Sequence, residues 1–171
     1  MVVAHSQTPN LDALMRRHQM YVWRYLRVLG CSSADADELT QEAFTRLLEG
    51  SFEERFEAAT RSYLTTAARQ LFLQMQAKRA RHVEVGWTDA VDAWFEQQCK
   101  NDDGEAWLTA LSECTARMRG RGAEVLHAFY GDGRSRAEVA AKLGMKENGV
   151  KTLLQRLRAQ LRACVERRLA R

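Results

Sequence analysis

Apolar residues recur at helical spacing along most of the chain, and this pattern predicts a protein built from helices alone. In the N-terminal half it predicts three helices, over residues 8–30, 33–48 and about 61–81. Residues 50–60 interrupt the period, and we expect a loop there that carries two aromatic side chains. The chain has one proline and ten glycines, which agrees with long uninterrupted helices.

The C-terminal half is organised around residues 133–162, which predict a helix, a glycine turn and a second, basic helix. Ser135 and Glu138 have the spacing of a capping box, and Gly144 stands where the chain must leave the first helix. Two short helices with an exposed basic face are typical of a helix-turn-helix that enters the DNA major groove, although a hairpin with a solvated basic face has the same pattern. The basic stripe of the second helix consists of Lys151, Gln155, Arg158 and Arg162.

Upstream of this pair, shorter helices are predicted over about 105–118 and 123–130. The stretch before them, 82–105, is acidic and rich in aromatic residues. Its apolar side chains could line one face of a short helix, and that face could pack between two domains or meet a partner. The sequence leaves both alternatives open.

Charge divides the chain more sharply than the net value of +4 suggests. Residues 85–113 carry one basic and seven acidic side chains, whereas residues 114–171 carry fourteen basic and five acidic ones. A strongly basic segment is the electrostatic signature of a polyanion binder. We therefore predict an all-α protein with two small helical domains, residues 1–84 and 106–171, joined by an acidic linker over 85–105.

Several classes of function find no support in the sequence. It has no run of 18 apolar residues, so we expect no membrane span, and the first ten residues do not have the pattern of a signal peptide. It also shows no metal-ligand spacing, phosphate loop or nucleophile–base pair, so we expect no metal, no cofactor and no enzymatic activity. Four scattered cysteines are interpreted as reduced, mostly buried thiols of a cytosolic protein: Cys31, Cys99, Cys114 and Cys164.

Two stretches together resemble a bacterial family, the extracytoplasmic-function (ECF) sigma factors of RNA polymerase. Residues 35–44, Asp-Ala-Asp-Glu-Leu-Thr-Gln-Glu-Ala-Phe, resemble the region 2 signature of that family, with the middle acids in swapped order. Residues 124–144 and 150–156 resemble its region 4. The ending over 161–169 is similar to one divergent subgroup. The resemblance covers nearly the whole chain except residues 82–105.

The resemblance implies a role for each domain. The acidic second helix would dock on the largest subunit of core RNA polymerase, through Asp35, Asp37, Glu38, Gln41, Glu42 and Phe44. The loop and third helix would hold the non-template strand of the −10 element, through Phe52, Arg55, Phe56, Arg61, Tyr63, Gln70, Gln74, Lys78 and Arg79. The helix-turn-helix would read the −35 element, through Arg134, Ser135, Arg136, Lys146, Asn148, Lys151, Thr152, Gln155, Arg156 and Arg158.

The recognition helix departs from the family pattern at its start. Lys146 stands where the family has a capping Ser, and Gly149 stands where it has Thr. A lysine at a helix N-terminus opposes the helix dipole, so Asn148 could cap instead and start the helix two residues later.

These observations predict an alternative sigma factor that works in the cytoplasm. Its partners would be core RNA polymerase and promoter DNA, and family members are commonly held by an anti-sigma factor. The alternative is a stand-alone helix-turn-helix regulator that uses residues 1–84 for dimerisation or partner sensing. A helical adaptor that has lost DNA binding is a third possibility.

Overall fold

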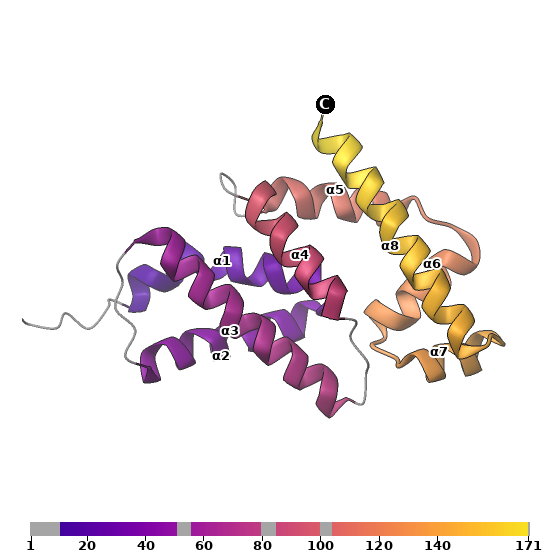
Figure 1. Cartoon of the computed structure of the whole chain (residues 1–171), viewed down its shortest axis with the longest axis horizontal. Helices are drawn as coiled ribbons and strands as arrows, with labels where there is room; N and C mark the ends of the chain where they lie inside the picture. The colour runs from indigo at the N-terminus through magenta and orange to yellow at the C-terminus, as the bar shows by residue number, and fades with distance from the viewer. Residues whose placement is uncertain (1–10, 51–55, 80–84, 100–103, 171) are drawn as a thin grey trace, which may run out of the picture.

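The computed structural model describes residues 11–50, 56–79, 85–99 and 104–170, and every regular element in these ranges is a helix (Figure 1). The predicted all-α fold is confirmed. None of the described helices is both long and apolar enough to cross a membrane. The elements are α1 (Leu11–Leu29), α2 (Ser33–Glu49), α3 (Glu57–Lys78), α4 (Val85–Gln98), α5 (Glu105–Ala116), α6 (Gly120–Leu126), the π-helix η1 (His127–Gly131), α7 (Arg136–Leu143) and α8 (Glu147–Leu169).

Local sequence signals account for the ends of the helices around the helix-turn-helix. The Ser135 hydroxyl accepts from the Glu138 backbone N–H, and the Glu138 carboxylate accepts from the Ser135 N–H, so the predicted capping box is formed. Gly144 ends α7 at φ 61°, in the left-handed region that favours glycine. At α2 the Ser32 hydroxyl accepts from the Asp35 N–H.

Two predicted helix starts are wrong. α3 begins at Glu57, so residues 57–60 are helical, and an ion pair of 2.9 Å between Glu57 and Arg61 stabilises this additional turn. The rest of the predicted loop, including Phe52 and Arg55, lies outside the described residues. α8 begins at Glu147 with Lys146 in the capping position, so Asn148 lies inside the helix and does not cap it.

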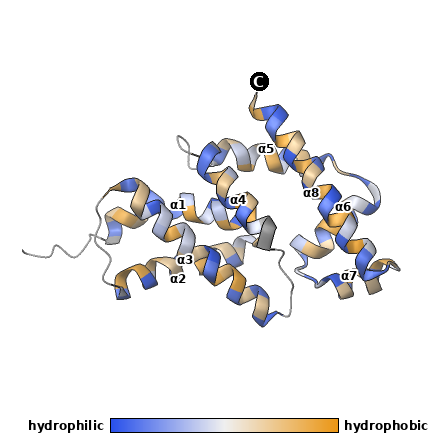
Figure 2. Ribbon diagram, in the orientation of Figure 1, coloured by the Kyte–Doolittle hydropathy of each residue, from blue (hydrophilic) through white to orange (hydrophobic). Residues whose placement is uncertain are grey.

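The buried side chains form two clusters. Apolar and polar positions alternate along the helices that supply them (Figure 2). The first joins α1, α2 and α3 to α4 and α5, and the second joins α6, η1 and α7 to the first half of α8. α8 reaches both clusters, because Leu154 and Leu157 are buried in the second and Val165 is buried in the first. α8 therefore connects the two clusters, and a disulfide joins it to α5 of the first.

The acidic linker contains α4, and the rings of Trp94 and Phe95 on this helix pack within the molecule. Phe95 contacts the rings of Tyr21 and Tyr25 on α1, at centroid distances of 5.1 and 5.4 Å. Trp94 contacts Trp107 of α5 at 4.4 Å. Of the two alternatives left open by the sequence, packing between the halves of the chain is the one that the structure shows.

The prediction that all four cysteines are reduced is wrong. Cys114 on α5 and Cys164 on α8 form a disulfide. The two residues are 50 positions apart, so only the packing of α5 against α8 brings their Cα atoms to 6.2 Å. Cys31 and Cys99 are buried and are not part of a disulfide, as predicted.

Candidate nucleic-acid and protein interfaces

An acidic surface follows the outer side of α2. Asp37, Glu38, Gln41 and Glu42 are exposed along it. Carboxylates on the first two turns complement the helix dipole, but the exposed surface continues beyond those turns, which suits a basic protein partner. Two other predicted contact residues, Asp35 and Phe44, are not exposed in this way.

Asp35 and Phe44 are not freely presented on this surface. Asp35 pairs with Arg79, which follows α3, and this hydrogen bonding raises the pKa of the Arg79 guanidinium despite the opposing effect of burial. The Phe44 side chain is only 2% exposed and belongs to the first cluster. A buried ring cannot contact a partner, so the assignment of Phe44 to polymerase docking is wrong; its role is in the core.

The predicted −10 residues of α3 fall into two groups. Gln70 and Lys78 are exposed. Arg61 stacks its guanidinium 4.5 Å from the centre of the Tyr21 ring besides pairing with Glu57. The Gln74 amide oxygen accepts from Arg46 at 3.2 Å. Gln74 is nevertheless exposed, whereas Arg61 is half-buried and is held on two sides.

An exposed apolar group lies at the N-terminal end of α3. Phe56 is 63% exposed and Tyr63 is 37% exposed, although both are aromatic. Leu48, at the end of α2, is 45% exposed, although the helical period places it on the inner face with Leu47. Exposed aromatic rings are what a protein needs to stack unpaired bases. Phe56 is consequently the strongest described candidate for contact with a single strand.

A polar network that the sequence analysis missed attaches the linker helix α4 to α3 and α1. The Arg69 guanidinium donates to Asp92 at 2.8 Å and to Thr88 at 2.9 Å, and it also pairs with Asp89. The Tyr25 hydroxyl donates to Asp92. Burial, and then this bond, raise the pKa of Tyr25. Arg69 is thus occupied by acidic residues of the linker, and the cations of α3 do not act as one phosphate-binding set.

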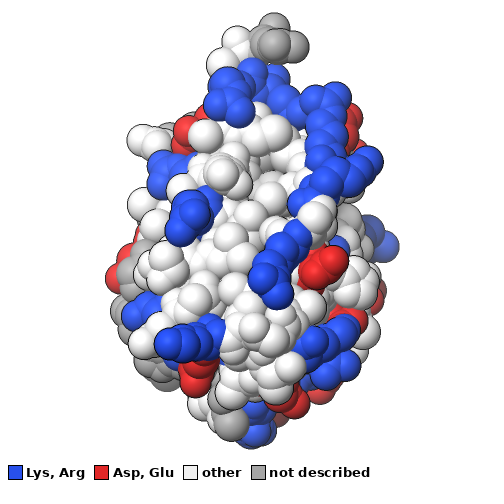
Figure 3. Space-filling model, turned by 90° about the vertical axis from the view of Figure 1, so that its right-hand side faces the viewer, with Lys and Arg blue, Asp and Glu red and all other residues white. Residues whose placement is uncertain are grey.

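Among the predicted −35 residues, those on the first half of α8 are presented together. Lys151, Thr152, Gln155 and Arg156 are all exposed. Figure 3 shows lysine and arginine side chains in a line on the side of the molecule where α8 runs, beside an uncharged surface. Lys146 and Asn148 are exposed at the start of the helix. A helix with this polar and cationic face has the properties needed in a DNA major groove.

Other predicted −35 residues already have partners within the protein. Arg134 pairs with Asp132 at 3.3 Å, and Arg136 pairs with Glu147 at 3.6 Å. Hydrogen bonding from Lys142, together with that from Arg134, lowers the pKa of Asp132. Ser135 is engaged in its capping box. These residues shape the turn between α7 and α8.

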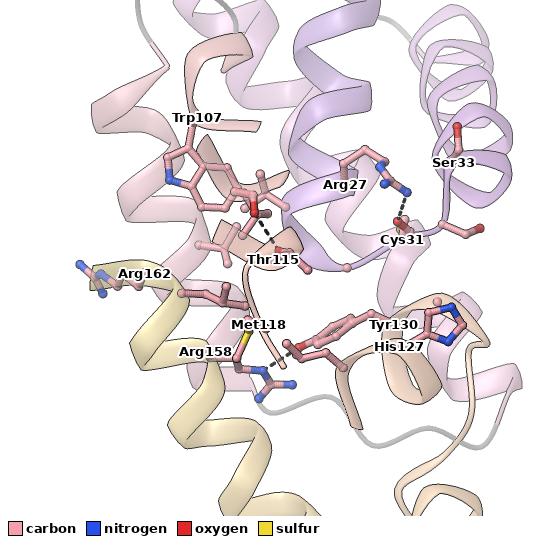
Figure 4. Close-up of a pocket in the computed structure, with 18 of the residues that line it drawn as sticks. Arg27, Cys31, Ser33, Trp107, Thr115, Met118, His127, Tyr130, Arg158 and Arg162 are labelled. Carbon is pink, nitrogen blue, oxygen red and sulfur yellow. Dashed lines mark hydrogen bonds between the residues drawn. The ribbon is translucent and has the colours of Figure 1, made fainter. Parts of the chain in front are cut away.

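Arg158 is the clearest correction within the predicted basic stripe. Its side chain is half-buried, and its Nε donates to the Tyr130 hydroxyl at 2.7 Å. The close-up shows Arg158 and Tyr130 together at the wall of a cavity of about 590 Å³ between the two halves of the molecule (Figure 4). Arg158 therefore contributes to packing on the inner side of α8, away from the exposed group of Lys151 and Arg156.

The wall of this cavity includes a close contact between the halves. Gly30 has φ 106°, and a Cβ placed on it would lie 2.6 Å from the Tyr130 ring. Glycine at this position thus permits both the backbone turn after α1 and the approach of η1. An ion pair of 3.2 Å between Arg24 and Glu105 joins α1 to α5, which both contribute to the first cluster.

Comparison with known proteins matches two separate regions of the chain. A family profile described as Sigma-70 region 2 matches residues 14–82, and one described as Sigma-70, region 4 matches residues 108–161. Together they cover more than two thirds of the chain. The chain belongs to the sigma-70 family of sigma factors.

Relatives of this sigma factor are found at moderate identity. The ECF RNA polymerase sigma factor SigL of Mycobacterium tuberculosis, found in three strains, is 29% identical over 156 residues, which cover 88% of this chain and 86% of SigL. Among solved structures, a chain of the RsbN–BldN complex is 21% identical and matches over 92% of both chains, with a TM-score of 0.34. At that score the structural likeness supports no inference about the arrangement of this sigma factor.

Proposed function

We propose that this protein binds core RNA polymerase and directs promoter-specific initiation of transcription as an alternative sigma factor. The observation that carries the proposal is the presence, on one chain, of an exposed acidic α2 within the region 2 match and an exposed basic α8 within the region 4 match. A stand-alone regulator has no need for the first surface. We place the protein in the cytoplasm, where its polymerase works.

The two surfaces take different parts in this function. Asp37, Glu38, Gln41 and Glu42 would contact a basic surface of the polymerase. Phe56 and Tyr63 would stack or position bases of the opened non-template strand, and Gln70 and Lys78 would line its path. Opening a duplex requires such stacking because unpaired bases lose their neighbours.

On the duplex upstream, the exposed first half of α8 would contact the −35 element. Lys151 and Arg156 are the best-placed cations, and Thr152 and Gln155 offer hydrogen-bonding groups beside them. Phosphate contacts position the helix, whereas contacts with base edges specify the sequence. We assign the chemistry of RNA synthesis to the polymerase. An anti-sigma factor is a further partner that we expect from the family.

The deciding experiment is run-off transcription of genomic DNA by core polymerase with and without this protein, followed by sequencing of the RNA 5′ ends. We expect new start sites that share −10 and −35 sequences. The double substitution Asp37→Ala with Glu42→Ala should abolish these start sites and weaken binding to core polymerase. Failure of the wild-type protein to bind core polymerase would refute the proposal.

The −35 half is tested separately on a duplex found in that experiment. Lys151→Ala and Arg156→Ala should each weaken binding and reduce the slope of log K against log salt by about 0.9 for each lost phosphate contact. Tight binding of the wild type to a palindromic duplex without polymerase would instead favour the stand-alone regulator. An unchanged affinity in both variants would favour the helical adaptor.

A further inference from the structure

The disulfide between Cys114 and Cys164 joins α5 to the C-terminal part of α8. Cys114 is buried on α5, and Cys164 is half-buried near the C-terminal end of α8. α8 is one continuous helix, so Cys164 lies about 20 Å along its axis from Lys151 at a rise of about 1.5 Å per residue. The bond anchors one end of the helix whose other end carries the proposed DNA contacts.

α5 links the anchored end of α8 to the rest of the protein. On one side it meets α8 through the disulfide and through an ion pair between Glu113 and Arg168. On the other side Trp107 packs on Trp94 of α4, within the first buried cluster. The bond thus connects α8 to the core that contains the N-terminal helices.

A disulfide at this position is unexpected for a protein that works in the cytoplasm. Thiols there are kept reduced, and the disulfides that do occur are usually catalytic or respond to redox conditions. The partial exposure of Cys164 gives small oxidants and reductants a route to the pair, whereas Cys31 and Cys99 are buried and are not part of a disulfide. The pair therefore has the properties of a site that is modified reversibly.

We propose that Cys114 and Cys164 form a reversible redox site, whose disulfide anchors α8 on α5 and strengthens the hold of α8 on duplex DNA. Oxidation by a peroxide-class oxidant forms the S–S bond: both thiols lose their hydrogens, and one peroxide is reduced to two waters. A dithiol reductant returns two electrons and two protons, and its own sulfurs become a disulfide. The redox half of this proposal is independent of the proposed function, whereas the DNA half, the effect on duplex binding, rests on that function.

The redox half is tested on the full-length native protein. It is treated with hydrogen peroxide and then with dithiothreitol, and at each step free thiols are alkylated and the peptides are mapped by mass spectrometry. We expect a Cys114–Cys164 cross-linked peptide after peroxide and two alkylated cysteines after dithiothreitol. Failure of the bond to form, or its persistence in native protein under dithiothreitol, would overturn the proposal.

The anchoring is measured by amide hydrogen exchange. Residues 160–168 of α8 should exchange about tenfold faster in the reduced protein, because local opening no longer works against the cross-link. Cys164→Ser should behave like the reduced wild type in both redox states. Cys99→Ser, which leaves the pair intact, should respond to redox conditions as the wild type does. Equal exchange in the oxidised and reduced wild type would contradict the proposal.

The DNA half is tested by fluorescence anisotropy with a labelled duplex that carries the −35 sequence. A pre-ordered helix loses less conformational freedom on binding, so we expect the oxidised protein to bind about fivefold more tightly than the reduced one. Cys164→Ser should show no redox difference. An identical affinity in both states of the wild type would refute this half alone, and the absence of any duplex binding would count against the proposed function instead.

Discussion

Asp35 and Arg79 form a double ion pair that joins the first turn of α2 to the residue that follows α3, with N–O distances of 2.7 and 2.8 Å. The sequence assigns Asp35 to polymerase docking and Arg79 to the DNA strand. In the structure the two side chains hold one another. Because they belong to neighbouring surfaces, disturbing one of them should affect the stability of the domain as well as binding.

This pairing predicts that Asp35→Asn and Arg79→Gln have coupled effects on stability. Arg–carboxylate pairs with two parallel bonds are stronger than most exposed pairs, so we expect a coupling of about 1 kcal/mol in a double-mutant cycle measured by urea denaturation. The control is Asp37→Asn, because Asp37 is exposed on the same helix. It should change the free energy of unfolding by less than about 0.5 kcal/mol. Additive effects of Asp35 and Arg79 would show that the pair contributes nothing.

Phe56 should matter for strand opening without stabilising the fold. Its ring is 63% exposed, so Phe56→Ala removes little buried surface. A stacked base contributes about 1–3 kcal/mol, which corresponds to roughly a five- to 150-fold loss in affinity for the single-stranded −10 segment. Met20→Ala is the matched control, because Met20 is another exposed apolar residue, 42% exposed on α1. Unchanged strand binding by Phe56→Ala would move the base contact to another residue.

Docking of the linker helix should depend on Asp92. Asp92→Asn leaves the Arg69 guanidinium and the Tyr25 hydroxyl without their charged acceptor, at a cost of about 1–3 kcal/mol in the free energy of unfolding. Backbone amides of α4 should exchange faster in the same variant. Glu96→Gln is the control, since Glu96 is exposed on the same helix, and it should leave both measurements close to wild type. A stable Asp92→Asn variant with a protected α4 would mean that aromatic packing alone holds the linker.

Substitutions at Gly30 and Gly144 distinguish two ways in which replacing a glycine lowers stability, namely backbone strain and a steric clash. Both have positive φ, of 106° and 61°, but a Cβ on Gly30 would meet the Tyr130 ring, whereas a Cβ on Gly144 would meet nothing within 4 Å. Gly144→Ala should cost about 1–2 kcal/mol for its backbone conformation alone. Gly30→Ala should destabilise the protein further, because the contact between the halves must also open. If both variants lose the same free energy of unfolding in chemical denaturation, η1 moves away from residue 30 without a loss of stability.

The buried thiol of Cys31 predicts an alkaline loss of stability. Burial, followed by the nearby Asp35 carboxylate, raises the pKa of Cys31 from 9.0 to about 12. Between these values the unfolded chain loses the thiol proton and the folded chain keeps it, so the free energy of unfolding falls as pH rises. The slope is at most about 1.4 kcal/mol per pH unit, and below pH 9 the contribution is fully present.

The test compares the wild type with Cys31→Ala in denaturation from pH 8 to about pH 11, where the variant should show a shallower decline. In a Cys99→Ser background with the disulfide intact, the ultraviolet absorbance of the folded protein is compared with and without Cys31→Ala, so that the difference reports the Cys31 thiolate apart from the tyrosines. Appearance of that thiolate near pH 9 would contradict the predicted shift.

The local elements were largely predictable because their signals lie within a few residues of one another. Helical periodicity indicated α1, α2 and α8, the capping box of Ser135 and Glu138 marked the start of α7, and Gly144 marked its end. For the linker, the spacing of its apolar residues indicated only that a short helix could form. The start of α3 was missed because an ion pair between Glu57 and Arg61 stabilises a turn that has no apolar period.

The exposed parts of both candidate surfaces were also indicated by the sequence. An acidic stretch and a basic stripe at helical spacing are visible without coordinates, and Asp37 and Lys151 lie where the pattern placed them. Residues within those stretches differed for one reason: a side chain can face a partner only if the rest of the chain leaves it uncovered. Phe44 is covered by the core, and Arg158 by its bond to Tyr130.

What the sequence by itself determined is therefore the helical fold, the order of the two signatures and the separation of acidic from basic charge. These properties depend on residue type and short spacing. The tertiary structure decided which residues pair across long separations: Asp35 with Arg79, Arg69 with Asp92, and Cys114 with Cys164. Such contacts arise from the packing of whole helices, whose relative placement depends on the summed burial of many side chains and is not encoded in any single motif.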